Sequence, residues 1–503
     1  MKNLVEIYKF LREKNLLSIE DDIDTDILVK EITYDSREVL PGTLFFCKGK
    51  EFKKEYLVKA LEKGAVAYVS EVDYELNAKA IIVKDIRKTM IELAAFFFDY
   101  PDKKIKIIGV TGTKGKTTTV KFLKSIFDHY LEVNGKKPCG IISTVDTYDG
   151  VSSYESSLTT PEAIPLYKNI NNAVNSGLEY LIIEVSSQAL KYDRVTNVHF
   201  DIGVFLNFGE DHVSEYEHPT IEDYFQSKLK LADLSDLFIF NSKMERYDLV
   251  KKHLDKENIS YKTFSLDDSN DDIYAEDIEF IKMESAFTSC YAGQKEKYNL
   301  YFPGDYNVEN ALASILVSKL LGLDYKSIYQ GLAEAKVEGR SVVLSTADEK
   351  ITCWVNYAHN GLSFQKSYDT IEQSYPGYKI ISIFGTPGDR ARVRMVDMCK
   401  IASKESDKIY IVPDDPGSEK FRDLAKKMVD IIKDYDIDYE IYDTRALGIK
   451  AAIEACKDRS ILFIAGKGDE KYSKVKGKLV EIEDDVSACK RLIKKYNEDH
   501  PGN

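Results

Sequence analysis

The chain has 503 residues, of which 44% are hydrophobic and 31% are charged, the balance of an ordinary globular protein. That length exceeds what one hydrophobic core normally supports, so about three domains are expected. The formal net charge of -14 argues against nucleic acid or an anionic membrane surface as the main partner, because binding to phosphate backbones needs a basic face. A local basic pocket for a phosphorylated small molecule remains compatible with this charge.

The seven cysteines are scattered and include no C-x-x-C pair, which favours buried free thiols over a disulfide framework or a zinc site. The N-terminal segment lacks a basic region followed by an apolar run and a small-residue cleavage site. No stretch approaches about 18 uninterrupted apolar residues. We therefore expect a cytoplasmic monomer without a signal peptide or a membrane span.

Short apolar strands alternate with helical patterns along the whole chain, as in parallel sheets that are covered on both faces. The expected fold class is α/β, with three domains in series: 1–102, a central P-loop-type domain over 103–337, and a Rossmann-like domain over 338–503. The expected strands are 44–47, 65–69, 80–83, 105–110, 181–185, 202–206, 379–385, 408–412 and 460–466. A helix over 87–100 is expected to end at Pro101.

A glycine-rich loop separates the strand 105–110 from a helical pattern over 120–130. It reads Gly112-Thr113-Lys114-Gly115-Lys116-Thr117-Thr118, with Val110 in place of the usual first glycine. Glycines let such a loop wrap its N–H groups around phosphates, and the helix N-terminus adds positive potential. Lys116 is expected to contact the outer phosphates of a nucleotide and the Thr117 hydroxyl to ligate Mg²⁺. The loop predicts nucleotide binding without fixing the reaction.

Polar residues after two later strands point to a ligase more than to a generic nucleotidase. Glu184 ends one strand, and ligands bind at the carboxyl ends of strands in open α/β sheets. Asp211 and His212 follow another strand, where a carboxylate and an imidazole could hold a second Mg²⁺. A lone histidine is more often structural, but the phosphate loop and Glu184 favour a ligand role for His212.

A further helix is predicted to start near Thr220, because Thr220 and Asp223 resemble a capping box. Tyr224 and Lys228 then lie on one helix face, four residues apart. Helical lysines are ordinarily surface residues, so spacing alone does not select Lys228 for a site.

Together these motifs resemble the Mur ligase family over almost the whole chain, and most closely its lysine-adding tripeptide synthetases. In the first region, Tyr34-Asp35-Ser36-Arg37 and 44–49 resemble the uridine-nucleotide-binding segment, with Ser36 at the contact position. Thr159-Thr160-Pro161-Glu162, Glu184-Val185-Ser186-Ser187-Gln188 and Arg194 match segments of the second region. The resemblance implies that the muramoyl-dipeptide substrate is held by Thr159, Thr160, Ser186 and Arg194.

The same resemblance assigns the catalytic and metal-binding residues. The catalytic set would be Lys116, Glu184, His212 and Lys228. Two Mg²⁺ ions would be held by Thr117, Glu184, His212 and Lys228, the last as a carbamylated lysine. ATP would also contact Asn310 and Arg340, and Asn307 and Asn310 match the family's adenine-side asparagines.

The third region departs more from the family pattern. Glu338 replaces a proline in the hinge segment 337–340, and Asn356 replaces an aspartate. The resemblance implies that Arg390 binds the α-carboxylate of the incoming amino acid, and that the rest of its site is Asp414, Asp415, Gly466 and Glu470. Enzymes that add diaminopimelate carry an arginine where this chain has Gly417, and that arginine can grip a distal carboxylate. The two aspartates favour a distal ammonium instead.

The resemblance thus implies an ATP-dependent ligase of peptidoglycan precursor synthesis. It would add L-lysine to UDP-N-acetylmuramoyl-L-alanyl-D-glutamate through an acyl phosphate, with closure about 337–340. The uridine-type first region and the Thr159-Thr160 turn argue against a folate or amino-acid-polymer ligase. Two alternatives stay open: the same ligase adding ornithine or another diamino acid, and a degenerate nucleotide-binding homologue with a regulatory role. The last is suggested by Asn356, Glu338 and Asp469, and phosphate release from ATP with and without the muramoyl dipeptide would distinguish it.

Overall fold

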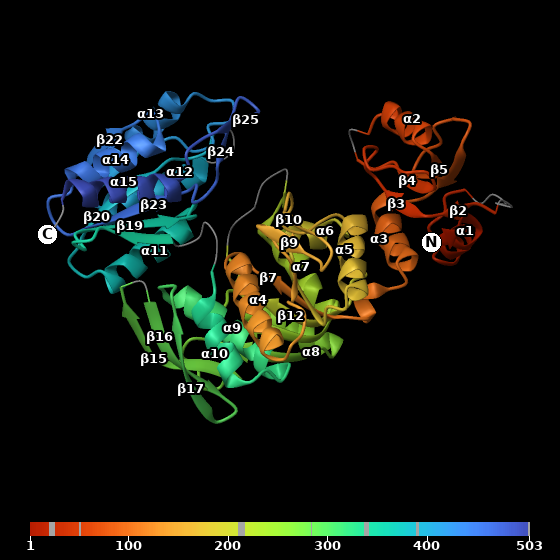
Figure 1. Ribbon diagram of the computed structural model, residues 1–503, viewed down its shortest axis with the longest axis horizontal. Helices are drawn as coiled ribbons and strands as arrows, with labels where there is room; N and C mark the ends of the chain where they lie inside the picture. Colours follow the sequence, from red (N-terminus) through yellow and green to blue (C-terminus); the bar gives the residue numbers. More distant parts are fainter. Residues whose placement is uncertain are drawn as a thin grey trace. The chain divides into compact units, whose positions relative to one another are not determined.

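The computed structural model describes residues 1–19, 26–49, 52–209, 217–282, 284–336, 342–388 and 392–500. The chain folds into two compact units, which are coloured by sequence in Figure 1. Unit 1 comprises Met1–Ala275, Ser289–Glu296 and Glu309–Glu334, and unit 2 comprises Glu276–Thr288, Lys297–Val308 and Ala335–Asn503. The division of the chain into three domains stays a prediction.

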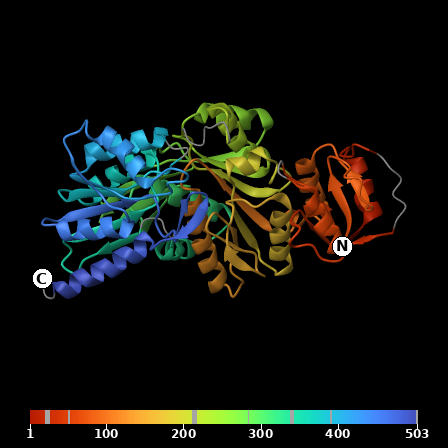
Figure 2. The same cartoon turned by 90° about the horizontal axis from the view of Figure 1, so that it is seen from above.

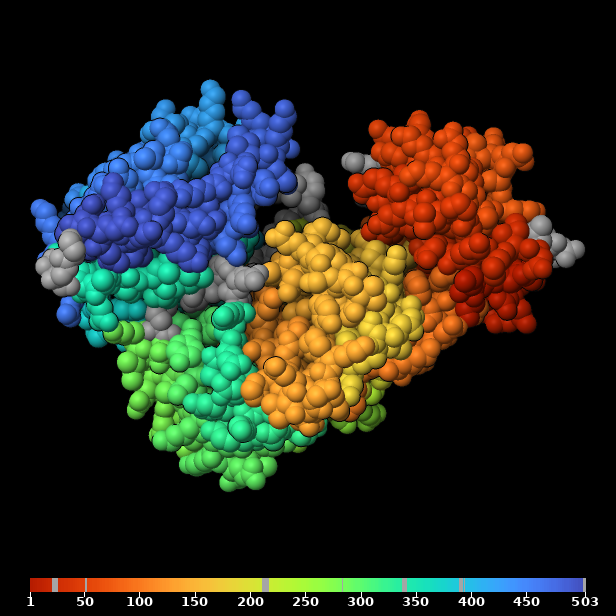
Figure 3. All heavy atoms as spheres, in the orientation of Figure 1, coloured from red at the N-terminus to blue at the C-terminus, as the bar shows by residue number. Residues whose placement is uncertain are grey.

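The first part of unit 1 is built on a parallel four-stranded sheet with the order β3-β4-β5-β6. Its atoms form the red to orange part of the space-filling view (Figure 3). Its strands are β3 (Glu31–Thr33), β4 (Thr43–Phe46), β5 (Ala65–Ser70) and β6 (Lys79–Ile82), its helices are α1 (Leu4–Glu13), α2 (Lys54–Glu62) and α3 (Ile86–Phe97), and β1 (Lys2–Asn3) pairs with β2 (Leu28–Val29).

Helix α3 shows how local sequence sets an element's bounds. Asp85 caps its start, because the carboxylate accepts hydrogen bonds from the N–H groups of Arg87 and Lys88. The helix ends at Phe97, three residues before the expected end, since Asp99 and Tyr100 adopt left-handed backbone angles. Tyr100 precedes a proline, which disfavours the helical conformation. A short 3₁₀ helix, η1 (Pro101–Lys103), follows.

The second part of unit 1 contains a larger sheet with the order β10-β9-β8-β11-β7-β12-β13-β14, after which β15, β16 and β17 follow. The strands β8, β11, β7, β12, β13 and β14 run parallel, as expected, whereas β9 and β10 add an antiparallel edge. The division between the units passes through β15, β16 and β17. The strands are β7 (Lys106–Thr111), β8 (Gly140–Ile142), β9 (Asp146–Tyr148), β10 (Ser153–Glu155), β11 (Tyr180–Glu184), β12 (Phe200–Phe205), β13 (Ser235–Asn241), β14 (Ser260–Phe264), β15 (Ile273–Ile281), β16 (Glu284–Tyr291) and β17 (Gln294–Leu300).

Helices alternate with the strands of this part of the chain, which Figure 2 shows from a second direction. They are α4 (Lys116–Val133), α5 (Ala163–Asn175), α6 (Ser187–Lys191), α7 (Ile221–Asp233), α8 (Tyr247–Glu257), α9 (Asp305–Leu320) and α10 (Tyr325–Glu334). Three neighbouring parallel strands, β11, β7 and β12, lie at the centre of the sheet. Their carboxyl ends therefore meet at one edge, where an open α/β sheet binds its ligands.

Unit 2 has a six-stranded sheet with the order β18-β19-β23-β20-β21-β22, parallel except for β18. The strands are β18 (Val342–Ser345), β19 (Ile351–Asn356), β20 (Lys379–Phe384), β21 (Lys408–Ile411), β22 (Asp438–Ile441) and β23 (Ser460–Ala465), with the hairpin β24 (Tyr472–Val475) and β25 (Lys478–Glu481). The helices are α11 (Gly361–Ser374), α12 (Arg392–Glu405), α13 (Phe421–Ile432), α14 (Arg445–Ala455) and α15 (Asp485–Asp499).

Both faces of this sheet carry a core. Along β23, Phe463 and Ala465 belong to one hydrophobic cluster, and Leu462 and Ile464 belong to another. Successive strand residues point to opposite faces, so each face is covered. This is the doubly covered α/β arrangement that the sequence predicts.

All seven cysteines are free, and all but Cys456 are buried, as the sequence predicts. Among the described helices, none combines the length and the apolar character needed to cross a bilayer.

Candidate active site

The phosphate loop follows β7 and leads into α4. Gly115 caps α4 with a left-handed φ of 82°, a conformation that glycine adopts without steric cost. A Cβ built on Gly115 would lie 2.4 Å from Oδ1 of Asn310. The loop therefore needs glycine here for two reasons, and Asn310, a predicted ATP residue, is buried directly against it.

Asn207, which follows β12, holds the loop from the other side. Its Oδ1 accepts a hydrogen bond from Lys114 N at 2.9 Å, its carbonyl accepts one from Thr113 N at 3.0 Å, and its Nδ2 donates to Lys114 O at 3.1 Å. Asn207 is absent from the predicted site. A polar residue just after a central strand is the signal that would have selected it.

Lys116 is the first residue of α4 and folds back over the loop. Its Nζ donates to the carbonyl oxygens of Gly112 at 2.9 Å and Thr113 at 3.2 Å. The ammonium group of Lys116 is thus held at the loop. This is the group that is expected to contact the outer phosphates of the nucleotide.

Thr117 and Glu184 meet across the ends of two strands. Thr117 Oγ1 lies 3.1 Å from each carboxylate oxygen of Glu184, and both residues are 2% exposed. The N–H and the hydroxyl of Thr144 also donate to Glu184 Oε2, each at 3.0 Å. A hydroxyl beside a buried carboxylate is an oxygen donor set that suits Mg²⁺, so these residues fit the predicted metal.

The predicted substrate residues continue from Glu184. Thr144 Oγ1, whose proton goes to Glu184, lies 3.0 Å from Thr159 Oγ1 and can accept a hydrogen bond from that hydroxyl. Thr160 Oγ1 donates to the carbonyl of Glu184 at 2.7 Å and accepts from Ser186 N at 3.0 Å. Thr159, Thr160 and Ser186 are therefore brought together beside the buried carboxylate. Thr144, which connects Thr159 to Glu184, is not among the residues selected from the sequence.

Arg194 reaches the same region through Glu162. Arg194 Nη2 lies 3.0 Å from Glu162 Oε1, and Nη1 donates to the carbonyl of Thr160 at 3.3 Å. The other carboxylate oxygen of Glu162 lies 2.5 Å from Nζ of Lys48, which comes from the first part of unit 1. Burial lowers the pKa of Lys48. Glu162 thus joins Arg194 to the segment that carries the predicted uridine residues.

A cavity of about 720 Å³ opens at the predicted uridine segment. Phe52 and Tyr56 offer aromatic surface for a base, and Lys48, Lys59 and Lys63 offer positive charge for phosphates. The cavity is lined by Tyr34, Asp35, Ser36, Arg37, Lys48, Gly49, Phe52, Tyr56, Lys59, Glu62 and Lys63. Ser36, the predicted contact residue, is therefore in its wall.

Lys228 is buried, unlike the usual helical lysine. It is 1% exposed, its Nζ donates to Gly112 O at 2.7 Å, and Nζ lies 4.6 Å from the ring centre of Tyr224 on the same helix. Thr220 caps this helix, α7, by accepting a hydrogen bond from Asp223 N at 3.1 Å. The expected helix thus delivers Lys228 to the phosphate loop.

His218 connects the helices α6 and α7. Its Nδ1 lies 2.6 Å from Asp223 Oδ2, and its Nε2 lies 3.0 Å from Ser187 Oγ. Asp223 also pairs with Lys191 of α6 at 2.7 Å. The His218 ring is fully buried, and this burial lowers its pKa. The sequence gives no local signal for this network.

Three predicted site residues, His212, Arg340 and Arg390, lie outside the described residues. The same holds for Asp211, for Asp389 and for the expected hinge 337–340.

The other residues that are predicted to bind the incoming amino acid lie in unit 2, just after β21 and β23. Lys467 Nζ lies 2.9 Å from Asp415 Oδ1 and also pairs with Glu470. A Cβ built on Gly466 would lie 2.8 Å from Asp414 Oδ2. Burial raises the pKa of Asp414 to about 6. The sequence does not distinguish the two aspartates. In the structure Asp415 is paired with Lys467, so Asp414 is the better candidate to bind the ammonium group of a ligand.

Gly417 lies in a tight turn against β24. Its φ is 63°, its N–H donates to Lys474 O at 3.0 Å, and its carbonyl accepts from Lys476 N at 2.6 Å. The motif position that carries arginine in diaminopimelate-adding enzymes is therefore left-handed here, a conformation that side chains disfavour.

Asn356, the replacement for an aspartate, ends β19. Its Oδ1 accepts a hydrogen bond from Ala358 N at 3.0 Å. An amide oxygen serves this role as a carboxylate would, so the turn is formed without the charge.

The chain matches known proteins along most of its length. A family model of the Mur ligase middle domain matches residues 110–318, and one of the Mur ligase, glutamate ligase domain matches 339–468. A UDP-N-acetylmuramyl-tripeptide synthetase of Lactococcus lactis subsp. cremoris (strain MG1363) is 34% identical over 465 residues, covering 92% of both chains. A UDP-N-acetylmuramoyl-L-alanyl-D-glutamate--L-lysine ligase of Enterococcus faecalis (strain ATCC 700802 / V583) is 35% identical over 479 residues, covering 93% of this chain and 92% of that one.

A solved UDP-N-acetylmuramoyl-L-alanyl-D-glutamate--2,6-diaminopimelate ligase has the same fold, with a TM-score of 0.68 at 22% identity over 99% of both chains. The family models and the relatives cover the phosphate loop, Glu184 and the Asp414 segment alike. The chain therefore belongs to the Mur ligase family of ATP-dependent ligases.

Proposed function

We propose that this chain adds L-lysine to UDP-N-acetylmuramoyl-L-alanyl-D-glutamate, using ATP, as a step of peptidoglycan precursor synthesis. The observation that carries the proposal is the convergence of Lys116, Thr117, Glu184 and Lys228 on one phosphate loop. The name of the Enterococcus relative supports the choice of L-lysine. A cytoplasmic monomer without a nucleic-acid partner stays our expectation from composition and charge.

The reaction proceeds in two transfers. The substrate carboxylate attacks the γ-phosphate of ATP, so ADP leaves and an acyl phosphate forms. Lys116 stabilises the charge on the transferring oxygens electrostatically. The amine of the amino acid then attacks the acyl carbon, and phosphate leaves with the surplus proton as the amide forms.

Magnesium would supply positive charge to the phosphates during both transfers. Thr117 and Glu184 offer oxygen ligands, and His212 with a carbamate on Lys228 would complete the set. Lys228 Nζ lies at Gly112 O, so a carbamate built on it would begin beside the phosphate loop.

Recognition of the amino acid would use both of its ends. Arg390 would bind the α-carboxylate, and Asp414 would face the distal ammonium, beside the paired acids Asp415 and Glu470. Diaminopimelate adds a carboxylate at that end, which these acids repel and Gly417 cannot neutralise. Ornithine keeps the ammonium one methylene shorter and is the alternative.

The test offers a panel of amino acids with ATP, Mg²⁺ and the UDP-linked muramoyl dipeptide, and measures phosphate release and product mass. Release that requires both the dipeptide and L-lysine is the expected result. Lys116→Ala should lower the rate by a factor of about 10³ or more. Phosphate release that ignores the dipeptide would overturn the ligase proposal in favour of a degenerate homologue.

A further inference from the structure

Arg445 forms a buried ion pair with Asp485 at the starts of two helices. It is the first residue of α14, Asp485 is the first residue of α15, and they are 5% and 0% exposed. Nε and Nη2 of Arg445 each lie 2.7 Å from a different carboxylate oxygen of Asp485. Such a bidentate pair fixes the plane of the guanidinium group.

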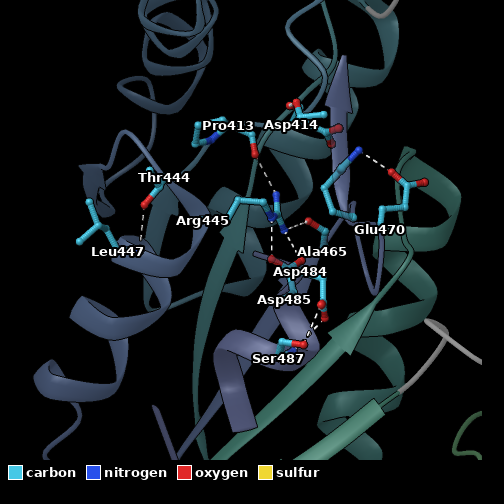
Figure 4. Close-up of polar contacts among 12 residues, drawn as sticks. Pro413, Asp414, Thr444, Arg445, Leu447, Ala465, Glu470, Asp484, Asp485 and Ser487 are labelled. Atoms are coloured by element: carbon cyan, nitrogen blue, oxygen red, sulfur yellow. Dashed lines mark hydrogen bonds and ion pairs between the residues drawn. The ribbon is translucent and has the colours of Figure 1, made fainter. Parts of the chain in front are cut away.

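The same guanidinium group also holds two chain segments that carry predicted amino-acid residues. Nη1 donates to the carbonyl of Pro413 at 3.1 Å, and Nη2 donates to the carbonyl of Ala465 at 2.8 Å. Pro413 immediately precedes Asp414, and Ala465 immediately precedes Gly466. Figure 4 shows Arg445 between these segments, with Asp485 on its other side.

This arrangement is a costly way to stabilise a fold. Burying an ion pair often contributes less than apolar residues of the same volume would. A cation at a helix N-terminus also opposes the helix dipole. The four hydrogen bonds to three separate segments suit a different purpose, which is to fix the spacing between those segments.

The fixed spacing concerns the Asp414 carboxylate. A Cβ built on Gly466 would lie 2.8 Å from Asp414 Oδ2 and 3.9 Å from Arg445 Nη1, so both groups border the same spot. The charged groups that act on Asp414 are Arg445, Lys467 and Asp415. Lys467 is shared with Asp415 and Glu470. Among the described residues of this cluster, the four acids Asp414, Asp415, Glu470 and Asp485 face two cations, Arg445 and Lys467. The cluster therefore keeps a net negative charge that suits an ammonium ligand.

We propose that Arg445 is a specificity-determining positioning residue, which selects the distal ammonium of the amino acid by holding the Asp414 and Gly466 segments in register. The inference rests on the proposed function. Arg445 acts through Asp414 and does not itself touch the amino acid.

The test compares Arg445→Met and Arg445→Lys with the wild type in the full-length enzyme. Arg445→Met should raise KM for L-lysine about 10-fold or more, while KM for ATP stays within about twofold. The preference for L-lysine over L-norleucine, which lacks the ammonium, should fall by a similar factor. Arg422→Met is the matched control, because Arg422 is an exposed arginine of the same unit that pairs at the surface with Asp443. It should change neither value.

The pH profile separates positioning from general stability. In the wild type, kcat/KM for L-lysine should decline below about pH 6, as the Asp414 carboxylate gains a proton. Removing the cation in Arg445→Met should move this decline about one pH unit higher. Arg445→Lys keeps the charge and should leave the decline in place, while KM stays raised because a lysine cannot span both carbonyls.

Two outcomes would overturn the inference. The first is an unchanged KM and pH profile for L-lysine in folded Arg445→Met. The second is a loss of activity that is equal for all substrates and accompanies a lower melting temperature. If Arg445→Met does not fold, Asp414→Asn provides the test. A decline of kcat/KM for L-lysine below about pH 6 that persists in Asp414→Asn would reject the inference. A wild type that ligates no amino acid would instead refute the proposed function, so the two failures are distinguishable.

Discussion

Thr117 Oγ1 lies 3.1 Å from both carboxylate oxygens of Glu184, although 67 positions separate the residues in sequence. The contact joins the phosphate-loop helix to the end of the neighbouring strand. A magnesium ion taken up here would bind between groups that the fold has already brought together, which lowers the cost of ordering its ligands.

Glu184→Gln should therefore reduce turnover by about 10²-fold or more and raise the Mg²⁺ concentration needed for half-maximal rate. The amide keeps the volume and one acceptor oxygen but removes the charge. Steady-state rates over a Mg²⁺ titration provide the measurement. Glu179→Gln is the control, because Glu179 precedes the same strand and pairs at the surface with Lys136. Wild-type magnesium dependence in Glu184→Gln would contradict the assignment.

Lys228→Ala should be nearly inactive and should recover part of its activity with added short carboxylates, which replace the oxygen atoms of a carbamate. Lys230→Ala offers a control on the same helix, since Lys230 is exposed. Mass spectrometry can lose a labile carbamate, so crystallographic density beyond Nζ is the direct check. An ordered bare ammonium in a magnesium-loaded crystal would be the contrary result.

L-Lysine should be preferred over meso-diaminopimelate by at least about 10²-fold in kcat/KM, or about 2.7 kcal/mol. Gly417→Arg should narrow this ratio by supplying a cation for the distal carboxylate. The left-handed turn at Gly417 should also cost about 1–2 kcal/mol of stability.

Gly377→Arg separates the effect of backbone strain from the effect of a cation in the amino-acid site. Gly377 also has a left-handed φ, of 80°, and open space around its Cβ position. It should lower the melting temperature and leave the amino-acid ratio unchanged. Equal use of both amino acids by the wild type would reject the choice of L-lysine and leave the ligase assignment intact.

His218 should make the protein less stable as the pH falls. Burial lowers its pKa from 6.5, so the unfolded state binds the proton more readily than the folded state. Stability is then fully present above about pH 6.5, declines as the pH falls toward the lowered value, and changes no further below it. The melting temperature of His218→Gln should depend less on pH across this window than that of the wild type. His253→Gln, at a partly exposed histidine that pairs with Asp233, should keep the wild-type dependence, and parallel curves for all three proteins would contradict the prediction.

The sequence could predict the elements whose signals are local. The apolar strand β7, the glycine loop and helix α4 follow one another in the chain as expected, although α4 starts at Lys116, four residues before the helical pattern 120–130. The bounds of α3 were less predictable, because two left-handed residues end it early. The antiparallel edge β9-β10 was missed, since its strands are three residues each and have no apolar run.

The contacts that complete the candidate site could not be predicted from spacing. Glu162 meets Lys48 from another sheet, and His218 meets Ser187 across a segment of 31 positions. Lys228 has an unremarkable helical position in sequence, and only tertiary packing buries it at Gly112. Such pairings depend on how separate elements pack, which no local pattern encodes.

The position of β23 in its sheet has a consequence for exchange with solvent. This strand is hydrogen-bonded on one edge to β19 and on the other to β20, and both of its faces are buried. Its amide protons should therefore exchange only when the sheet opens as a whole, whereas those of the β24–β25 hairpin should exchange through local fraying. Gly466 directly follows β23, so the proposed amino-acid site would be anchored to the segment of unit 2 that we expect to open last.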